Sequence, residues 1–471
     1  MSVVMKFGGT SVADAEAMKR VIGIVRRQHD RHPGDKLPVV VVSAMSKVTD
    51  RLIETGRLAG VGRGDEAAAL LADLLKRHLT VASALVPSDA FGALEQTLGG
   101  QFAALTPKVR HLAATGEVSP ASHDEIVAMG ELASSGIVAA AFKAEGLPAV
   151  WIDAREVLVT DAEHGAAVPD MAATLERTQT LVARRRDAGE VVVLGGFIGA
   201  TAAGVTTTLG RGGSDYSAAI FGACLDVGEI QIWTDVDGML TADPRIVSNP
   251  SLVPHLSFDE ASELAYFGAK VLHPSTILPA VAKNIPVRIL NSRRPDVAGT
   301  LITAEGRVHD GLTALACKRG VSVVDITSTR MLMAHGFLRR LFEVFERFRT
   351  PVDVVTTSEV SVSVTVDNPR RLDDIVANLR KFAEVNVESD MAIVCAVGEN
   401  LRADPTLFGR AVTSLDRIPL RLVSQAASRR NITFVLRDND VPVAMHRLHE
   451  TFFEASQAPA GADRSAVEAV N

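Results

Sequence analysis

Two glycine-rich segments carry the residue types that bind phosphate groups. The first is the sequence KFGGTS at residues 6–11, which lies between an apolar run typical of a strand and a helical pattern. Paired glycines let backbone N–H groups approach an anion, the next helix adds its positive end, and Lys6 adds a full charge. An ordinary strand-to-helix turn with a surface lysine fits the hexapeptide equally well. The segment is neither GxxxxGK[ST] nor GxGxxG, which disfavours a P-loop ATPase and a Rossmann dehydrogenase.

The second segment is TTTLGRGGSD at residues 206–215, where three glycines surround Arg211 ahead of an apolar helical pattern. The planar fork of an arginine matches the oxygens of a carboxylate or a phosphate, so this segment favours an anion site. The plainer interpretation is that Ser214 or Asp215 caps the helix, and both interpretations can hold together.

Three further segments are weaker when each is taken alone. The sequence WTDVDG at residues 233–238 follows a predicted strand at its carboxyl end, where open α/β sheets bind ligands, although a simple turn explains it too. Lys270 in FGAK fits a solvated surface charge better than a phosphate ligand. Glu131 interrupts an apolar helical pattern, and by itself it fits the wet face of that helix better than a buried bond to a cation.

A sheet must bring these segments together, and the chain alternates strand and helix patterns over its first 300 residues or so. Apolar β-branched runs predict strands at residues 3–7, 38–43, 150–153, 191–195, 230–234 and 287–290. Helical patterns occur at residues 13–28, 124–144, 170–187 and 216–225. This alternation predicts an α/β fold with a mostly parallel sheet and helices on both faces.

The pattern changes after about residue 305, where strands and helices repeat in the order of a small βαββαβ unit. Strands are predicted at residues 321–327, 352–357, 360–366, 392–397, 420–424 and 432–436. Helices are predicted at residues 337–348, 372–382, 408–415 and 441–453. We therefore expect a first domain over 1–305, two α+β ferredoxin-like repeats over 312–390 and 391–457, either sequential or intertwined, and a disordered tail over 458–471.

Composition excludes several classes of protein. The apolar fraction of 47% and the charged fraction of 22% fit globular domains, and the net charge of 49 − 56 = −7 opposes nucleic acid or an anionic membrane as the main partner. Cys224, Cys317 and Cys395 are isolated, which indicates buried thiols in a reducing compartment and no zinc site. The N-terminus lacks the apolar core of a signal peptide, and the longest apolar stretch is shorter than the ~18 residues of a membrane span. We expect a cytoplasmic protein.

In their order and spacing, these segments resemble the amino-acid kinase family and, within it, the aspartokinases. The matching positions are KFGGTS, Ser43, Thr49, GE at 130–131, GFIG at 196–199, TTTLGRGGSD, WTDVDG, DPR at 243–245 and FGAKVLHP at 267–274. The resemblance implies transfer of the γ-phosphoryl group of ATP to the side-chain carboxylate of L-aspartate, which yields 4-phospho-L-aspartate. This reaction is the first step toward lysine, threonine and methionine.

The resemblance also implies roles for individual residues. Lys6 would bridge the phosphoryl group and the attacking carboxylate, and Asp215 would orient Lys6. Aspartate would be bound by Ser43, Thr49, Glu131, Arg211 and Ser214, with Glu131 on its ammonium and Arg211 on its α-carboxylate. ATP would contact Lys6, Gly8, Gly9, Ser11, Gly213, Thr234, Asp235, Leu240, Arg245 and Lys270. Leu240 stands where some relatives have tyrosine, which weakens any expectation of stacking there. Mg²⁺ would be held mainly by ATP oxygens and water, so no metal site of the protein's own is expected.

The C-terminal repeats resemble paired ACT domains, which bind amino acids at dimer interfaces. The positions that match a lysine-binding region are Met331, Phe337, Leu338, Val352, Asp353, Thr357, Ser358 and Glu359. Ala334 and Pro351 replace polar residues of some relatives, which leaves the effector open. We expect lysine feedback on a monofunctional enzyme that forms a dimer through these repeats, or a tetramer. The repeats could instead serve dimerisation alone.

Three alternative functions stay open: a threonine-regulated aspartokinase, a kinase for another substrate such as glutamate, N-acetylglutamate or a nucleotide monophosphate, and a catalytically inactive amino-acid sensor. Glu131 and Arg211 together favour a free α-amino acid as the substrate. The charged residues of the site disfavour the sensor, because an inactive relative would be expected to have lost some of them.

Overall fold

The computed structural model describes residues 2–31, 34–268, 272–306, 311–328, 335–367, 369–425 and 429–454. The chain divides into two compact units. The first unit comprises Met1–Met239, Pro254–Ala261 and Val271–Gly306, and the second comprises Leu240–Val253, Ser262–Lys270 and Arg307–Asn471. Two short segments that the sequence places in the first domain, 240–253 and 262–270, therefore belong to the second unit.

The first unit is built on an eight-stranded sheet in the order β3-β5-β2-β1-β8-β10-β11-β9. Its strands are β1 (Val3–Phe7), β2 (Val39–Val42), β3 (Ala149–Trp151), β5 (Val191–Gly195), β8 (Glu229–Thr234), β9 (His255–Ser257), β10 (Val287–Asn291) and β11 (Thr300–Thr303). Neighbouring strands are parallel except for the antiparallel pair β10 and β11. The four consecutive valines of β2 are all buried, as expected for a parallel sheet that is covered on both faces. The predicted mostly parallel sheet is confirmed.

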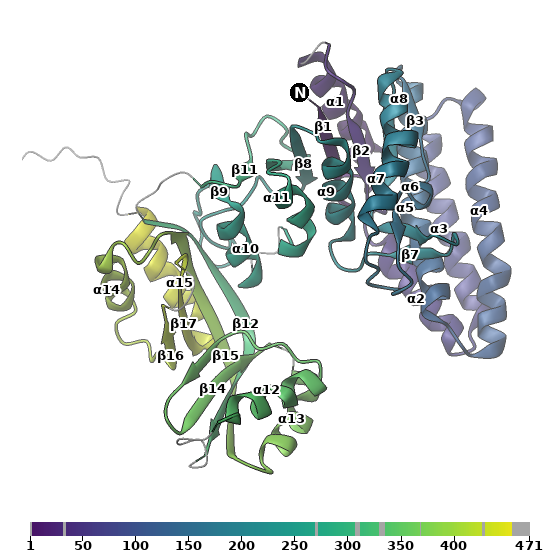
Figure 1. Cartoon of the computed structure of the whole chain (residues 1–471). Helices are drawn as coiled ribbons and strands as arrows, with labels where there is room; N and C mark the ends of the chain where they lie inside the picture. The colour runs from purple at the N-terminus through teal and green to yellow at the C-terminus, as the bar shows by residue number, and fades with distance from the viewer. Residues whose placement is uncertain are drawn as a thin grey trace, which may run out of the picture. The chain divides into compact units, whose positions relative to one another are not determined.

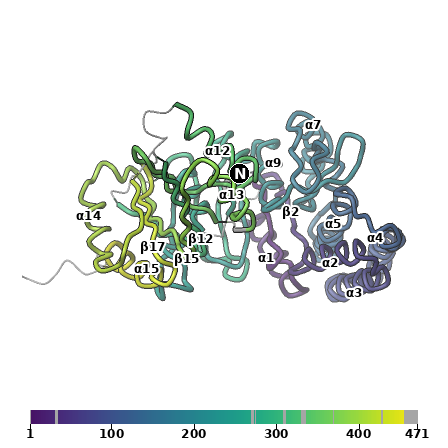
Figure 2. Tube along the Cα trace, turned by 90° about the horizontal axis from the view of Figure 1, so that it is seen from below, coloured from purple at the N-terminus to yellow at the C-terminus, as the bar shows by residue number. Residues whose placement is uncertain are grey.

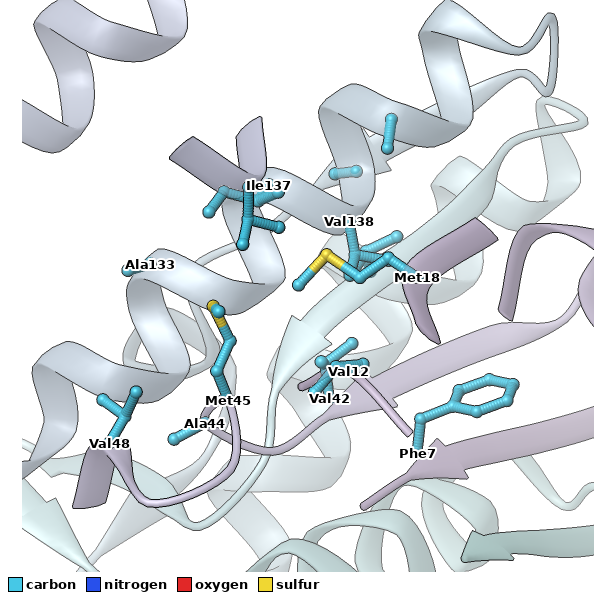
Figure 3. Close-up of a cluster of buried hydrophobic side chains, with 14 of the residues drawn as sticks. Phe7, Val12, Met18, Val42, Ala44, Met45, Val48, Ala133, Ile137 and Val138 are labelled. Atoms are coloured by element: carbon cyan, nitrogen blue, oxygen red, sulfur yellow. The ribbon is translucent and has the colours of Figure 1, made fainter. Parts of the chain in front are cut away.

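The alternation of side chains along β1 separates the two faces of the sheet. Met5 and Phe7 belong to an apolar cluster with side chains of α1 (Ala15–Arg31) and α5 (Pro120–Ala144), some of which Figure 3 shows. Lys6 points to the opposite face, where its ammonium meets Asp215 of α9 (Gly213–Leu225). Helices therefore cover both faces, and Lys6 lies on the face that α9 covers.

Three helices between β2 and α5 were not predicted from the sequence: α2 (Val48–Gly60), α3 (Gly64–Ser83) and α4 (Ser88–Thr115). Helices α3 and α4 lie side by side (Figures 1 and 2), and their buried leucines and Phe102 extend the cluster that α1 and α5 share. Helix α5 is long and apolar enough to cross a membrane by length and composition alone. However, 83% of its apolar window is buried inside the protein, so α5 is a core helix of this unit.

Shorter elements complete the first unit. A three-stranded sheet contains β4 (Val159–Thr160), β6 (Ile198–Thr201) and β7 (Thr206–Thr208). The predicted helix at 170–187 is present as α7 (Met171–Arg177), a π-helical stretch (Thr178–Ala183) and α8 (Arg184–Asp187). The remaining helices between β3 and β11 are α6 (Ala154–Val157), α10 (Phe258–Tyr266), a 3-10 turn (Pro274–Ile277) and α11 (Leu278–Ala282), and α10 continues into the second unit.

The second unit contains an antiparallel six-stranded sheet in the order β13-β14-β12-β15-β17-β16. Its strands are β12 (Gly311–Thr327), β13 (Val355–Thr357), β14 (Ser361–Val366), β15 (Glu384–Glu399), β16 (Leu422–Ser424) and β17 (Asn431–Arg437). Its helices are α12 (Phe337–Arg347), α13 (Leu372–Leu379), α14 (Pro405–Ser414) and α15 (Val441–His449). Figure 1 shows β12 and β15 running the length of the sheet, with α12 and α13 toward one end and α14 and α15 toward the other.

Each of the two long strands contributes to two separate apolar cores. The C-terminal half of β12, including Val324, packs with α12 and α13, whereas its N-terminal half, including Leu315, packs with α14 and α15. Residue 390, the predicted boundary between the repeats, lies inside β15. Residues 311–319 thus pair with the part of β15 that belongs to the later core, although they precede the earlier one in sequence. The predicted tail at 458–471 lies outside the described residues.

Candidate active site

A pocket of about 540 Å³ lies in the first unit, at the carboxyl ends of β1, β2 and β8. Open parallel sheets bind ligands at this edge because the loops that follow the strands meet there. The N-terminal turn of α9 and Glu131 of α5 complete the lining. Eleven of the predicted site residues line this one pocket: Lys6, Gly8, Gly9, Ser43, Thr49, Glu131, Gly213, Ser214, Asp215, Thr234 and Asp235.

The loops after β1 and β2 pack directly on each other. The N–H of Ser46 donates to the carbonyl oxygen of Gly9 at 3.1 Å, and a Cβ on Gly9 would lie 2.9 Å from the carbonyl oxygen of Ala44. Only glycine allows this approach. Arg77 of α3 donates to the carbonyl oxygens of Ser46, at 3.0 Å, and Ala13, at 3.2 Å, and so ties both loops together from behind.

Lys6 and Asp215 form an ion pair inside the pocket. The Lys6 Nζ lies 2.6 Å from the Asp215 Oδ1, and the side chains are only 10% and 13% exposed. Asp215 lies in the first turn of α9, which follows the N-cap residue Gly212 with its left-handed backbone. Ser214 and Asp215 lie in the first turn and neither caps the helix, so the capping prediction is wrong. Their side chains line the pocket instead.

Glu131 is buried at the base of the pocket with only one of its carboxylate oxygens bonded. Its Oε1 accepts from the Ala44 N–H at 3.1 Å, whereas its buried Oε2 has no hydrogen-bond partner among the described residues. Burial raises the pKa of this carboxyl to about 8, against the opposing effects of the Ala44 N–H and the Lys6 charge. Glu131 is 3% exposed, so its expected position on the wet face is wrong.

Gly130 explains how Glu131 can lie so close to the loop after β2. A Cβ on Gly130 would lie only 2.7 Å from the Cβ of Ala44, so a larger residue would push this loop away from α5. The loop is also held by the Ser134 hydroxyl, which donates to the carbonyl oxygen of Ser43 at 2.8 Å. Gly130 thus allows the loop after β2 to approach α5 closely, and Glu131 places its carboxylate toward the pocket.

A buried network around Asp124 positions the glycine-rich loop that precedes α9. The Asp124 carboxylate accepts from the Thr208 N–H at 3.1 Å and hydroxyl at 2.7 Å, from the Gly165 N–H at 3.1 Å, and lies 2.9 Å from the His164 Nδ1. Burial opposes ionisation, but hydrogen bonds, including that from His123, outweigh it and lower the pKa of Asp124. Sequence reasoning missed this residue, although an aspartate in the apolar α5 pattern was a signal.

Several predicted residues do not line the pocket. Ser11 is buried beneath the loop, where its hydroxyl donates to the Ser292 hydroxyl at 2.8 Å and to the carbonyl oxygen of Trp233 at 3.3 Å. Arg211 has an exposed side chain, although Gly210 and Gly212 on either side of it contribute to the lining. Two more predicted ATP ligands, Leu240 and Arg245, belong to the second unit. The position of Lys270 stays a prediction, because this residue lies outside the described residues.

The pocket also contains residues that sequence reasoning did not assign: Thr10, Met45, Ser46, Lys47, Asp50 and Phe197. Phe197 and Lys47 share an uncommon feature, since both are non-glycine residues with positive φ, at 67° and 64°. No local sequence signal marks that conformation at either residue.

The predicted effector residues lie in the second unit around β13 and the start of α12. Asp353 is the buried member, with its carboxylate 3% exposed and its Oδ1 2.7 Å from the Nζ of Lys318. That ammonium also lies 4.6 Å from the ring centre of Tyr266. The partly or fully exposed members are Phe337, Leu338, Val352, Thr357, Ser358 and Glu359. Pro351 is exposed, whereas Met331 and Ala334 lie outside the described residues.

Sequence models of known families match both units. The model of the amino acid kinase family matches residues 1–291, and the model of an ACT domain matches residues 394–452. The chain therefore belongs to the amino acid kinase family.

Individual relatives narrow the assignment. Aspartokinase 3, chloroplastic, of Arabidopsis thaliana is 38% identical over 98% of this chain and 83% of its own length. Lysine-sensitive aspartokinase 3 of Escherichia coli is 33% identical over 96% of this chain and 99% of its own length. Within the family, the chain belongs to the aspartokinases with a C-terminal ACT domain.

Solved structures agree with this grouping. E. coli aspartokinase III in complex with aspartate and ADP (R-state) aligns with a TM-score of 0.82 and 34% identity, over 96% of this chain and all of that chain. The structure of E. coli aspartokinase III with lysine and aspartate (T-state) aligns with a TM-score of 0.80 and 34% identity, over 96% of this chain and 99% of that chain.

Proposed function

We propose that this protein transfers the γ-phosphoryl group of ATP to the side-chain carboxylate of L-aspartate, forming 4-phospho-L-aspartate and ADP. The observation that carries the proposal is the buried Glu131 Oε2, which has no hydrogen-bond partner among the residues that the structure describes, in a pocket that also holds the Lys6–Asp215 pair. A substrate ammonium would supply the missing donor, so the pocket suits an amino acid with a free amino group. The E. coli relative that carries aspartate and ADP supports the same assignment.

The reaction brings two anions together, and this requirement explains the role of Lys6. The attacking carboxylate is ionised near pH 7 and needs no general base, but it must approach a phosphoryl group that already carries negative charge. In our proposal the Lys6 ammonium neutralises charge between the two groups, while Asp215 holds that ammonium in place. Hydrogen bonds from Ser43, Thr49 and Ser214 would fix the amino acid, and Arg211 would close on its α-carboxylate.

The nucleotide would occupy the side of the pocket formed by the loops after β1 and β8. Backbone groups at Gly8, Gly9 and Gly213 would contact phosphates, with Thr234 and Asp235 nearer the nucleoside. Ser11 would contribute indirectly, because its hydroxyl supports the loop from beneath. Contacts from Leu240, Arg245 and Lys270 stay predictions.

Mg²⁺ would enter the site together with ATP. Within the parts of the chain that the structure describes, no group of three or more His, Cys, Asp or Glu side chains is arranged to hold a metal ion. This donor set fits an ion that is bound mainly by phosphate oxygens and water.

Trapping the acyl phosphate tests the proposed reaction. Purified protein incubated with ATP, Mg²⁺, L-aspartate and hydroxylamine should form aspartyl hydroxamate at the rate at which ADP is released. Glutamate, N-acetylglutamate and a nucleotide monophosphate in place of aspartate test the alternative kinases. Glu131→Gln keeps the shape of the side chain but should lose most activity with aspartate, because its amide lacks the negative charge that pairs with an ammonium. Folded protein that releases no ADP with any of these substrates would point to the inactive sensor, because ADP release reports transfer to a carboxylate and to a phosphate alike.

We also propose lysine as a feedback effector that binds the ACT unit around Asp353, in a cytoplasmic homodimer or tetramer. The E. coli relative with bound lysine supports this choice. Titration of the activity with lysine, threonine and methionine distinguishes lysine control from the threonine-regulated alternative, and insensitivity to all three would indicate that the repeats serve assembly alone.

A further inference from the structure

Lys47 is a charged residue of the pocket that neither the sequence motifs nor the proposed mechanism assigns. It lines the pocket between the glycine loop and Thr49, and its side chain is exposed there. Its backbone is left-handed, with φ of 64° and ψ of 5°, and it precedes α2 at the N-cap position without a side-chain capping bond. Such a conformation costs free energy for any residue with a Cβ, and glycine would adopt it without that cost.

The surrounding structure imposes the left-handed turn on Lys47. Met45 and Val48 are buried, and Figure 3 shows their side chains pointing toward α5 while the chain between them turns away from it. The Val48 N–H donates to the Met45 carbonyl oxygen at 2.9 Å, which closes the turn. Ser46 is fixed by its bond to Gly9 and by Arg77. Lys47 is thus anchored on both sides and placed over the pocket.

The charges of the pocket indicate what an ammonium at this position would do. The cationic side chains that line it within the described residues are Lys6 and Lys47, and Lys6 is already paired with Asp215. The lining also contains Asp50, Asp235 and the buried Glu131, yet the substrates are anionic. No ion pair joins Lys47 to another described residue, which leaves its ammonium available to a ligand.

We propose that Lys47 binds an oxyanion of the reacting pair, either the transferring phosphoryl group or a carboxylate of the amino-acid substrate. The bond from Ser46 to Gly9 brings its loop against the phosphate-binding loop, and Ser43 and Thr49 of the same segment line the pocket beside it. This contact would explain why a lysine occupies a left-handed position that glycine would adopt without strain. This inference rests on the proposed phosphoryl transfer to aspartate.

Three substitutions separate charge from backbone strain. Lys47→Asn removes the ammonium with a residue that tolerates left-handed backbone, Lys47→Gly removes both charge and strain, and Lys47→Arg keeps the charge. We expect Lys47→Asn and Lys47→Gly to lower kcat/KM for aspartate or MgATP by at least about fivefold, without lowering the melting temperature. Lys47→Arg should stay within about fivefold of the wild type. Arg417→Asn, at another exposed left-handed cation, controls for net charge and should change neither property.

The two possible oxyanions give different kinetic results. A contact with the substrate carboxylate raises KM for aspartate, whereas a contact with the phosphoryl group lowers kcat or raises KM for MgATP. The proposal is overturned if Lys47→Asn stays within about fivefold of wild type, or if Lys47→Arg loses as much activity as Lys47→Asn. If the wild type itself shows no aspartate-dependent ADP release, the proposed function fails. Calorimetric binding of MgATP and aspartate to wild type and Lys47→Asn would then test the oxyanion contact.

Discussion

The carboxylate of Asp124 accepts hydrogen bonds from both the backbone N–H and the hydroxyl of Thr208. Asp124 lies on α5, about two helical turns before Glu131, and Thr208 ends β7 just before the glycine-rich loop. A Cβ on Gly210 of that loop would lie 3.0 Å from the carbonyl oxygen of Gly165, whose own N–H donates to Asp124. One buried carboxylate thus joins the helix that carries Glu131 to the loop that carries Arg211.

Replacing Asp124 by alanine should therefore affect both stability and substrate binding. Thr208, Gly165 and His164 would lose their common acceptor in a fully buried place, which we expect to cost about 3 kcal/mol in the free energy of unfolding. KM for aspartate should rise, because the glycine-rich loop loses its attachment to α5. Urea unfolding and steady-state kinetics measure the two effects.

Thr208→Val is the matched control for this network, because it removes the hydroxyl bond and leaves the backbone bond. Its cost should be about 1 kcal/mol, with little change in KM. Equal costs for both substitutions would mean that the Asp124 network is weaker than its geometry indicates.

Glu131 should make aspartate binding depend on pH. Burial raises its pKa to about 8 in the free protein, and a bound ammonium lowers that pKa by favouring the carboxylate. Below pH 8 binding must therefore release a proton. The dissociation constant for aspartate should fall by up to about tenfold per pH unit as pH rises toward 8, and it should level off above that pH. Calorimetry in buffers of different ionisation enthalpy counts the released proton, and a pH-independent affinity would refute the role of Glu131.

The same shift in pKa predicts a pH-dependent stability difference between wild type and Glu131→Gln. The folded-state pKa is raised from 4.5 to about 8, so the contribution of Glu131 is complete below pH 4.5 and is lost as pH rises through 8. Relative to Glu131→Gln, the unliganded wild type should lose up to about 1.4 kcal/mol per pH unit over that interval. Chemical unfolding at pH 5, 6.5 and 8 measures the difference, and parallel curves would contradict it.

Much of the sheet could be predicted because its strands are local patterns. Strands β1 and β5 have the predicted bounds, since each is a short apolar run that glycine or polar residues terminate. Helices α2, α3 and α4 were not predicted, and α4 contains Gly99, Gly100 and Pro107, which have low helix propensity and are held in the helix by tertiary packing. The interleaving of β12 and β15 depends on pairing between residues about 70 positions apart, which local periodicity does not encode.

The site was predictable where glycines and charges are grouped in sequence, and not where tertiary contacts decide. The Lys6 and Gly213–Asp215 segments were found from their residue types. The burial of Glu131 could not be predicted, because a single carboxylate in an apolar helix fits the exposed face and the buried face equally well. Only the position of the neighbouring loop decides between the two. Lys47 was missed for a related reason, since its left-handed backbone follows from the anchoring of Met45 and Val48 and not from its own propensity.

Removing the Lys6 ammonium should reduce turnover far more than substrate affinity. In the proposed mechanism, Lys6→Ala deletes the charge that neutralises the approaching anions, so kcat should fall by about 10²–10³-fold while KM for aspartate changes by only a few fold. Asp215→Asn should give a smaller loss, and the double variant should be little worse than Lys6→Ala because Asp215 acts through Lys6. Lys19→Ala, which removes an exposed lysine of α1, is the control. An unchanged kcat in Lys6→Ala would refute the proposed role.

Lys318 should compete with an effector for Asp353. The Asp353 carboxylate is buried against the Lys318 ammonium at 2.7 Å, and the side chain of Tyr266 lies beside both. Lys318→Met removes the internal cation but keeps most of the apolar stem, which should cost about 3 kcal/mol by leaving a buried carboxylate unpaired. Free lysine could then supply the missing charge. It should raise the melting temperature of Lys318→Met more than that of wild type, by a concentration-dependent amount.

Asp353→Asn distinguishes this competition from a general increase in the response of the protein to lysine. If the side-chain ammonium of lysine binds at Asp353, removing this carboxylate should abolish the effect of lysine. Lysine should then raise the melting temperature of neither Asp353→Asn nor the double variant Asp353→Asn with Lys318→Met. Threonine, which lacks a side-chain ammonium, should not replace lysine in the Lys318→Met protein. An equal response of wild type and Lys318→Met to lysine would show that the effector's ammonium binds elsewhere, and the Lys318–Asp353 pair would then be a structural feature of the ACT unit.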